Sequence, residues 1–552
     1  MVKKIHKSFE VGSDSNNIQA DVIILGCSLP GIVTAHKLKK KFGNTMDIVV
    51  LDIAGTPKMI SKCNVSFLTD EEEEETMEST EEEEEDNTEI HANDSMARHF
   101  LTKYAKELNI PLPECILGPY SKPNLNKLFQ HRNGNTVECS ADFHDFGYLN
   151  FTEKLELNQF QARLDHSMKN MFRYFEGDKE SERKKLLYYD QTTMEQYICD
   201  SLLFSTSREI MRTTVRLVCG VPADSVSILF YLHQCYRTSS SRNHLDGDNT
   251  RLREKLLGYC RKRLVSQLEQ SIEEITLPIK SIKEIRTYSD EQVILLTMMG
   301  ETNYICNLLA MALRPDELRK IKVEDQLLSK KHAAISGAMS RGRAKKFVIE
   351  YDNNFWAAQG YSGDIFSVRG PIIWAMEKPN LSTTGSLGRY VSLIGYLKVK
   401  DNNRNASNNK SAVIEQLVKL FGPEAEKTIS YKETEIADVF VPRCGDYVAL
   451  RKFTGEVNTK LLEWSALDIF ADGDVVSALQ AGHAAYLHLL TYLRPQAQTF
   501  EDLSTANWPT VLNTDAAEDL LSYMNYKQSI RIVVYAAVIF IGFRLIRGYM
   551  QK

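Results

Sequence analysis

A glycine-rich run near the amino terminus has the spacing of a dinucleotide-binding turn. It reads Gly26-Cys27-Ser28-Leu29-Pro30-Gly31. In a complete G-x-G-x-x-G run the first glycine makes the turn, the second lets the backbone approach a pyrophosphate, and the third allows close packing of helix on strand. Gly26 and Gly31 fill the first and third places, Ser28 fills the second, and Asp52 stands where an acid would bind the ribose. A turn that only packs, with no ligand, is an equal alternative.

The elements that would position this turn can be predicted on both sides of it. The β-branched run Asp21–Leu25 ends at Gly26 and predicts a buried strand. Apolar residues recur with helical spacing over 31–41, and Asp47–Leu51 predicts a second strand that ends at Asp52. Strand, turn, helix, strand and terminal acid together predict a nucleotide-binding βαβ unit over residues 21–66, after a tail over 1–20.

Composition indicates an ordinary globular chain with an unusual charge distribution. The 552 residues, 43% hydrophobic and 25% charged, are enough for two or more domains with sizeable cores. Between Asp70 and Glu89 there are 14 acidic residues and no basic one, so the rest of the chain carries −6 + 14 = +8. A mildly basic body suits an anionic cofactor, a membrane surface or nucleic acid, and does not choose among them.

The acidic block predicts a disordered insert over residues 67–95, because like charges repel and few apolar residues are available to bury. It is either a docking segment for a basic partner or a solvated loop. A second polar stretch, Asp401–Ser411, predicts a surface loop. Helical patterns dominate over Met194–Ile275, and short strands are predicted at Gln292–Met298, Lys346–Tyr351 and Ile365–Val368.

The ten cysteines are scattered singly, with no CxxC pair and no zinc-like spacing. This distribution favours a reducing compartment and gives no reason to expect a metal site. The first ten residues contain no apolar run, so no signal peptide is predicted.

An apolar stretch near the carboxyl terminus predicts a membrane anchor. Ile530–Ile546 is 17 residues long, about 25 Å as a helix, which is at the short end for crossing a bilayer. Arg531 and Arg544 lie near its ends and can extend their charged groups to the interface. We expect residues 530–547 to form a tail anchor after a linker over 516–529, with a buried core helix as the alternative. The short span and basic flanks favour the mitochondrial outer membrane, with the body facing the cytosol, over the endoplasmic reticulum.

Several segments, in their order and spacing, resemble the flavin monoamine oxidase family over most of the chain. The helical ones are similar to that family's substrate-side region and final flavin-contacting helix, and the strand segment to its lysine-bearing strand. These segments are Met194–Cys219, Ser225–Phe230, His233–Cys235, Lys346–Tyr351, Phe355–Trp356, Tyr361–Gly363 and Ser477–Gly482. The resemblance implies a doubly wound, Rossmann-like α/β FAD domain and a discontinuous mixed-sheet and helical substrate domain, together spanning residues 96–515 beyond the βαβ unit. It also implies a mitochondrial tail anchor and a homodimer.

The resemblance assigns roles to individual residues. FAD is the implied cofactor, and Lys346 falls where the family keeps a lysine that is water-bridged to the flavin. A surface lysine at a strand end is the alternative reading of Lys346. Cys444 falls near the covalent flavin-linking cysteine, and Asp474 stands for an acid that contacts the cofactor. The cofactor-binding residues implied are Gly26, Gly31, Asp52, Gly258, Cys444 and Asp474.

The chain departs from the family at cofactor and amine contacts. The Gly-Gly-Arg turn after the second strand reads Lys58–Lys62, and the Gly-Gly-x-Gly loop reads Lys255–Gly258 and keeps one glycine. Larger side chains there fill space that the flavin would need. Gly445 follows Cys444 where the family has a cage tyrosine, and the stretch with the second tyrosine is missing.

Two functions therefore remain. The first is a catalytically inactive homologue that binds protein partners as a scaffold, and the second is an active FAD-dependent amine oxidase that releases hydrogen peroxide. A basic cluster around Lys330–Lys346 has no aromatic interleaving, so nucleic-acid binding is not supported.

Overall fold

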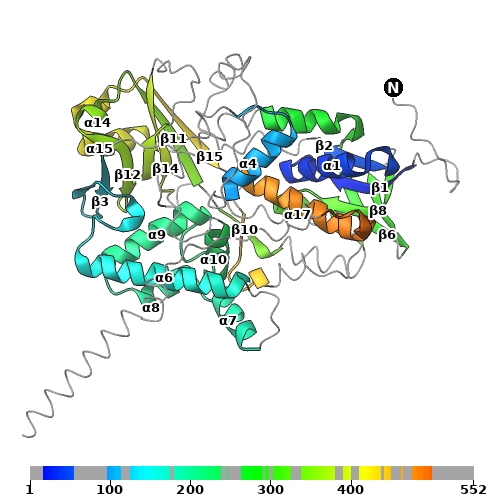
Figure 1. Ribbon diagram of the computed structural model, residues 1–552, viewed down its shortest axis with the longest axis horizontal. Coiled ribbons are helices and arrows are strands. Elements are labelled where there is room, and N and C mark those ends of the chain that lie inside the picture. The colour runs from blue at the N-terminus through cyan, green and yellow to red at the C-terminus, as the bar shows by residue number, and fades with distance from the viewer. Residues whose placement is uncertain are drawn as a thin grey trace, which may run out of the picture.

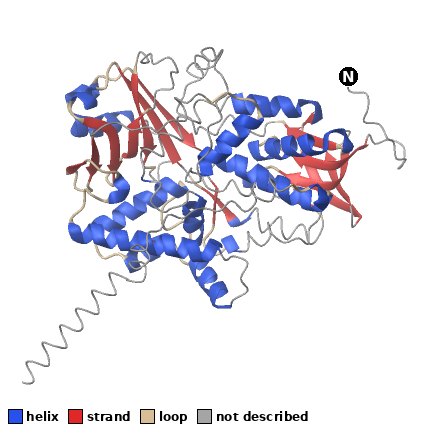
Figure 2. Ribbon diagram, in the orientation of Figure 1, coloured by secondary structure: helices blue, strands red, loops and turns tan. Residues whose placement is uncertain are grey.

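The computed structural model consists of two β-sheets at opposite ends of the molecule, with helices covering both and a helical layer beside the second sheet (Figures 1 and 2). The residues that it describes are 17–54, 96–112, 125–173, 180–237, 245, 263–289, 292–297, 302–324, 337–342, 344–378, 390–399, 409–436, 440–448, 462–463 and 475–499.

The first sheet contains the amino-terminal strands. Its order is β5-β2-β1-β8-β7-β6-β9, and β17 also pairs with β8. β1 runs parallel to β2 and to β8, whereas β7 is antiparallel to both β8 and β6. The strands are β1 (Asn17–Leu25), β2 (Ile48–Ile53), β5 (Thr276–Ile279), β6 (Ile282–Ser289), β7 (Gln292–Thr297), β8 (Asn303–Met311), β9 (Lys322–Val323) and β17 (Leu462–Glu463).

Both faces of β1 are buried, as its continuous apolar run predicts. Val22 and Ile24 belong to the hydrophobic cluster formed with α1 (Leu29–Phe42), α4 (Met96–Glu107), a helix over 263–272 and α17 (Val475–Leu493). Ile23 and Leu25 belong to the cluster formed with the helical layer. The predicted βαβ elements are therefore confirmed, with β1 beginning four residues earlier than the sequence suggested.

The second sheet has the order β15-β11-β14-β13-β12-β3-β4. One face packs on α14 (Phe355–Ala358) and α15 (Lys410–Phe421). The predicted loop 401–411 is corrected at its end, because α15 already begins at Lys410. The strands are β3 (Asn126–Gln130), β4 (Thr136–Cys139), β11 (Ala344–Tyr351), β12 (Tyr361–Ser367), β13 (Ile372–Glu377), β14 (Val391–Leu397) and β15 (Ser430–Ile436). A small separate sheet pairs β10 (Met339–Arg341) with β16 (Phe440–Pro442).

The helical layer is built from successive helices with clear end signals. The Thr193 side chain accepts a hydrogen bond from the Gln196 amide at the start of α8, and Gly220, with a positive φ of 66°, ends α9. The helices are α6 (Phe151–Arg173), α7 (Glu180–Gln191), α8 (Met194–Ser201), α9 (Ser205–Cys219) and α10 (Ile228–Arg237). Shorter helical turns are α12 (Pro315–Leu318), η1 (Gly43–Thr45), η2 (Phe143–Asp145), η4 (Glu273–Ile275), η5 (Pro423–Glu426) and η7 (Pro495–Ala497).

Several predictions concern residues outside the described ranges. These are residues 1–16 of the predicted tail 1–20, the acidic insert 67–95, the linker 516–529 and the anchor 530–547. Among the helices that the structure describes, none combines the length and apolar character needed to cross a bilayer. The domain boundaries and the anchor stay predictions.

Candidate functional site

The turn after β1 is held by close packing at its two glycines. Gly26 has a positive φ of 104°, and its amide donates to the Leu51 oxygen at 2.9 Å. A Cβ atom on Gly26 would lie 2.7 Å from the Ala312 oxygen, and one on Gly31 would lie 2.5 Å from the Ala312 Cβ. No real Cβ fits at such distances, so both glycines are required to pack α1 against the residue that follows β8. This requirement holds whether or not a nucleotide binds.

Ser28 occupies the N-cap position of α1 without capping the helix. Its backbone is extended, and its side chain makes no capping hydrogen bond. The residue is only 6% exposed, and its hydroxyl oxygen has no hydrogen-bond partner among the described residues. Pro30 removes one amide donor from the first helical turn, and that turn contains no acidic residue.

The whole turn is covered by protein atoms. All six residues from Gly26 to Gly31 are buried. A turn that holds a pyrophosphate must present backbone and first-turn amides to the ligand, and that surface would be accessible when no ligand is present. In this arrangement the Gly26–Gly31 turn therefore exposes little surface to a pyrophosphate.

Asp52 lies at the same edge of the first sheet as the glycine turn. It is half-buried near the end of β2, where Leu51 pairs with Leu25 of β1, directly before Gly26. The structure thus brings Gly26, Gly31 and Asp52 together, as the sequence predicted from the βαβ pattern. Gly258 and Asp474 lie outside the described residues, and their proposed contacts with the cofactor stay predictions.

Lys346 lies within β11 and is buried, with 6% exposure, so the surface-lysine reading is wrong. It pairs across the sheet with Tyr396 of β14, which pairs in turn with Trp374 of β13. The Lys346 ammonium lies 5.5 Å from the centre of the Tyr396 ring, and the two aromatic rings are 6.0 Å apart. On the same face Val348 packs with Trp374 and with Leu217 of α9. A buried cation beside the Tyr396 ring therefore lies on the face of the second sheet that packs against α9.

Cys444 is anchored to the end of α7. Its thiol donates a hydrogen bond to the main-chain oxygen of Asp190 at 3.2 Å, and the Gly445 amide donates to the same oxygen at 2.8 Å. Burial, and then the Asp190 and Asp446 carboxylates, raise the pKa of the Cys444 thiol. The thiol is therefore kept protonated, whereas a nucleophilic cysteine needs an electropositive surrounding that favours the thiolate.

Asp190 is the residue of this region that the sequence did not reveal. Its buried carboxylate accepts the Tyr447 amide at 3.2 Å and the Val448 amide at 3.0 Å. The Tyr447 hydroxyl in turn lies 2.7 Å from Nδ1 of His233 on α10, and its ring meets Phe230 edge-on. Tyr447 is thus packed into the helical layer. No sequence motif marks Asp190, since a single acid at a helix end resembles any surface carboxylate.

The described residues form a mixed α/β fold that matches FAD-dependent amine oxidases. No protein-family model matches the chain. Over 253 residues it is 24% identical to a "Probable flavin-containing monoamine oxidase A" of Dictyostelium discoideum. That match covers 45% of this chain and 54% of the relative, so it spans about half of the relative's length.

Solved structures extend the likeness to the fold as a whole. A double mutant of putrescine oxidase matches with a TM-score of 0.63 at 14% identity, covering 86% of this chain and all of the other. Cyclohexylamine oxidase from Brevibacterium oxydans matches with a TM-score of 0.59 at 16% identity, covering 85% and 98%. The sequence-based resemblance to the flavin monoamine oxidases is confirmed, and the mixed α/β fold is that of amine oxidases.

Proposed function

We propose that this chain is a monoamine oxidase-like protein that does not oxidise amines and acts instead as a binding or scaffold protein. The observation that carries the proposal is the closed turn around Ser28, where all six residues of the glycine run are buried. Amine oxidation needs the flavin as the acceptor of two electrons, because no side chain can take that role. A chain whose dinucleotide turn is closed lacks the first requirement of the reaction.

The arrangement around Cys444 supports the same proposal. Its thiol hydrogen points to the Asp190 main-chain oxygen, and the neighbouring carboxylates disfavour the thiolate. The aromatic side chain nearest to it in sequence, Tyr447, is used in a hydrogen bond with His233. These contacts give both residues structural roles in place of the covalent link and the aromatic wall that the family resemblance implies, which supports the proposal.

The alternative function is an active FAD-dependent amine oxidase, and Lys346 is the observation that favours it. A buried ammonium beside Tyr396 costs desolvation energy, and such a group is common at functional sites. The flavin-containing relative makes FAD plausible for this chain.

We further propose that residues 530–547 hold the protein in the mitochondrial outer membrane, with the endoplasmic reticulum as the alternative, and that the chain forms homodimers. The sequence of the segment and its basic flanks support the location. Fractionation of cells that express the full chain, with and without the charge substitutions Val534→Asp and Ile539→Asp, tests whether this segment is the anchor. A doubly substituted chain that stays in the membrane fraction contradicts it.

The proposed loss of oxidase chemistry is tested by the absorbance spectrum of the full chain in mild detergent, before and after acid precipitation. We expect no flavin bands from the folded protein and no hydrogen peroxide from a panel of amines. Flavin bands that remain in the precipitate, together with peroxide release, would establish the oxidase and refute the proposal. Flavin bands that move to the supernatant would show non-covalent binding, and peroxide release would then decide between the two functions.

A further inference from the structure

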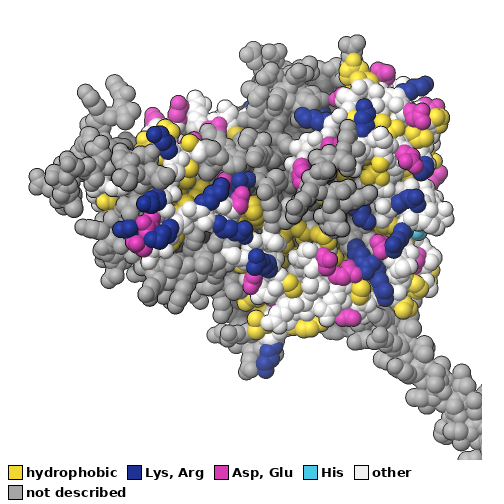
Figure 3. Space-filling view, turned by 180° about the vertical axis from the view of Figure 1, so that it is seen from behind, with side chains coloured by type: hydrophobic (Ala, Val, Ile, Leu, Met, Phe, Trp, Pro, Cys, Tyr) yellow, Lys and Arg dark blue, Asp and Glu magenta, His cyan; other side chains and the backbone are white. Residues whose placement is uncertain are grey.

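Four cationic side chains gather where turns of the second sheet meet α9. We call Arg132, Arg216, Arg369 and Lys398 the basic edge. The Arg369 Nη1 donates to the Arg132 main-chain oxygen at 3.3 Å, and the Arg216 Nη1 donates to the Val399 oxygen at 3.2 Å. The Lys398 amide donates to the Pro371 oxygen at 2.7 Å. Seen from behind, Lys and Arg side chains lie over both ends of the molecule, with Asp and Glu side chains among them (Figure 3).

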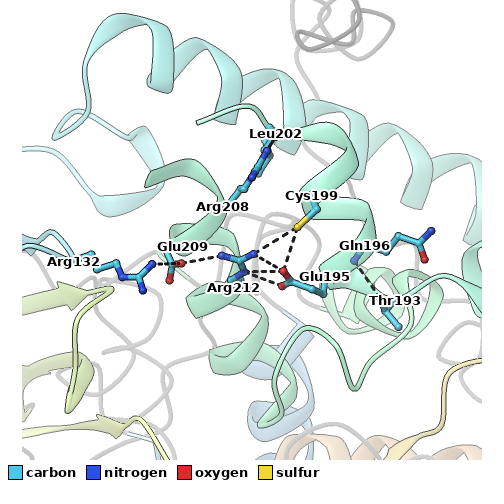
Figure 4. Close-up of polar contacts among 9 residues, drawn as sticks. All are labelled: Arg132, Thr193, Glu195, Gln196, Cys199, Leu202, Arg208, Glu209 and Arg212. Atoms are coloured by element: carbon cyan, nitrogen blue, oxygen red, sulfur yellow. Dashed lines mark hydrogen bonds and ion pairs between the residues drawn. The ribbon is translucent and has the colours of Figure 1, made fainter. Parts of the chain in front are cut away.

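The basic edge has more positive than negative charge. Arg132, whose side chain is 79% exposed, reaches Glu209 of α9 at 3.3 Å, but Arg212 holds the same carboxylate at 2.8 Å (Figure 4). Glu195 is also used by Arg212. Within the described part of the chain, Arg216, Arg369 and Lys398 form no ion pair, and Arg369 and Lys398 are exposed. Glu209 and Glu195 are shared with Arg212, and Glu415, whose charge interacts with Arg369, pairs with Lys419. The four cations therefore outnumber the acids near them.

We propose that the basic edge binds an acidic segment of a partner protein. Three of its four cations are arginines, whose planar guanidinium groups match the two oxygens of a carboxylate. A membrane surface fits less well, because none of the exposed large apolar side chains of the described residues lies in the turns that carry the edge; they are Phe151, Leu187, Tyr188, Leu203, Tyr390 and Ile429. Single-stranded nucleic acid would need aromatic stacking surfaces there. The inference deepens the proposed binding role and rests on it for its biological meaning, but its test measures neither flavin nor oxidation.

The test is fluorescence anisotropy of a labelled glutamate–glycine peptide titrated with the full chain in mild detergent. We expect binding that weakens as salt is added, and no binding of the matching glutamine–glycine peptide. The double variant Arg132→Glu, Arg369→Glu should weaken binding by at least about tenfold. Lys106→Glu with Lys427→Glu makes the same change of charge at two exposed positions elsewhere and should leave the affinity within about twofold.

A gentler pair, Arg132→Gln with Lys398→Gln, keeps the test valid if charge reversal disturbs folding, which a thermal melt reports. Equal losses in the edge variant and the control variant would overturn the proposal, because the binding would then follow net charge alone. Failure of the parent chain to bind the glutamate peptide would overturn it as well. Anionic lipid vesicles are added in a parallel titration, and binding to vesicles but not to the peptide through the same residues would assign the edge to a membrane instead.

Discussion

The Sγ atom of Cys444 lies 3.2 Å from the main-chain oxygen of Asp190, so the loop after β16 is fastened to the end of α7. The Asp190 carboxylate completes the clamp by accepting two amides of the same loop. A residue that the family resemblance assigns to a cofactor is here part of a structural junction between the helical layer and the small β10–β16 sheet.

The clamp predicts a stability loss on removal of the Asp190 carboxylate. Asp190→Ala should lower the free energy of unfolding by about 2–3 kcal/mol, because the buried amides of Tyr447 and Val448 lose their acceptor. Urea unfolding of the full chain measures it, and the rate of Cys444 modification by a thiol reagent should rise in parallel. Asp352→Ala, which removes a carboxylate at an exposed position, serves as the control. An Asp190→Ala chain as stable as this control would show that the clamp contributes nothing.

Removal of the Ser28 hydroxyl should instead stabilise the protein. Ser28→Ala removes a buried oxygen that has no partner among the described residues, so the free energy of unfolding should rise by about 1 kcal/mol. Ser227→Ala is the matched control: Ser227 is also buried, but its hydroxyl accepts the Phe230 amide at 3.2 Å, and its removal should destabilise the protein. A stability loss for Ser28→Ala of the same size as for Ser227→Ala would reveal a bonding partner for Ser28 and argue against a closed, ligand-free turn.

Substitution of Gly31 should lower the stability of the protein whether or not a cofactor binds. Gly31→Ala places a Cβ 2.5 Å from that of Ala312 and should cost about 2–3 kcal/mol of stability, since α1 must shift away from β8. Gly147→Ala is the control, because among the described residues no atom outside its chain neighbours lies within 4 Å of the Cβ that it adds. Thermal unfolding of both variants compares them, and equal melting temperatures would show that the glycine is not kept for packing.

Gly26 and Gly31 show which features of the fold and the site could be predicted from the sequence. The continuous apolar run before Gly26 and the helical spacing after Gly31 predicted the βαβ elements correctly, because local patterning and burial agree there. The same glycines suggested a cofactor, but their close approach to Ala312 gives them a packing role that a single sequence does not separate from a binding role. The closure of the turn depends on tertiary contacts, which leave no local pattern.

Lys346 and Asp190 show the same difference between local structure, which the sequence predicts, and tertiary contacts, which it does not. The strand around Lys346 was predicted, but its burial follows from cross-strand pairing with Tyr396 and from the cover given by α9, both distant in sequence. Asp190 acquires its role from a loop more than 250 positions away, as its hydrogen bond to Tyr447 spans a separation of 257 residues. Sequence patterns report local periodicity, whereas these contacts are set by topology.

A cluster of ionisable side chains between α1 and α4 should make the stability of the protein depend on pH. The Glu107 carboxylate, with 8% exposure of its side chain, contacts His36 at 3.3 Å, Lys40 at 3.0 Å and Lys37. His36 also lies 2.8 Å from the Ser271 hydroxyl, which connects the cluster to the helix over 263–272. Burial alone would raise the pKa of Glu107, but hydrogen bonds with His36, Lys37 and Lys40 and the charge of Lys37 outweigh it and hold the pKa well below its ordinary value of 4.5.

Because the pKa of Glu107 is lower in the folded chain than in the unfolded chain, its ionised form stabilises the fold above pH 4.5, and this contribution is lost as the pH falls toward the folded pKa. Glu107→Gln should therefore destabilise the protein at neutral pH by about 2–4 kcal/mol, since it leaves the largely buried Lys37 ammonium without its partner. It should also flatten the decline of stability below pH 4.5. Urea midpoints measured over a series of pH values give both quantities, with Glu424→Gln at an exposed position as the control. If Glu107→Gln declined below pH 4.5 with the slope of the parent chain, the acid sensitivity would have to come from other carboxylates.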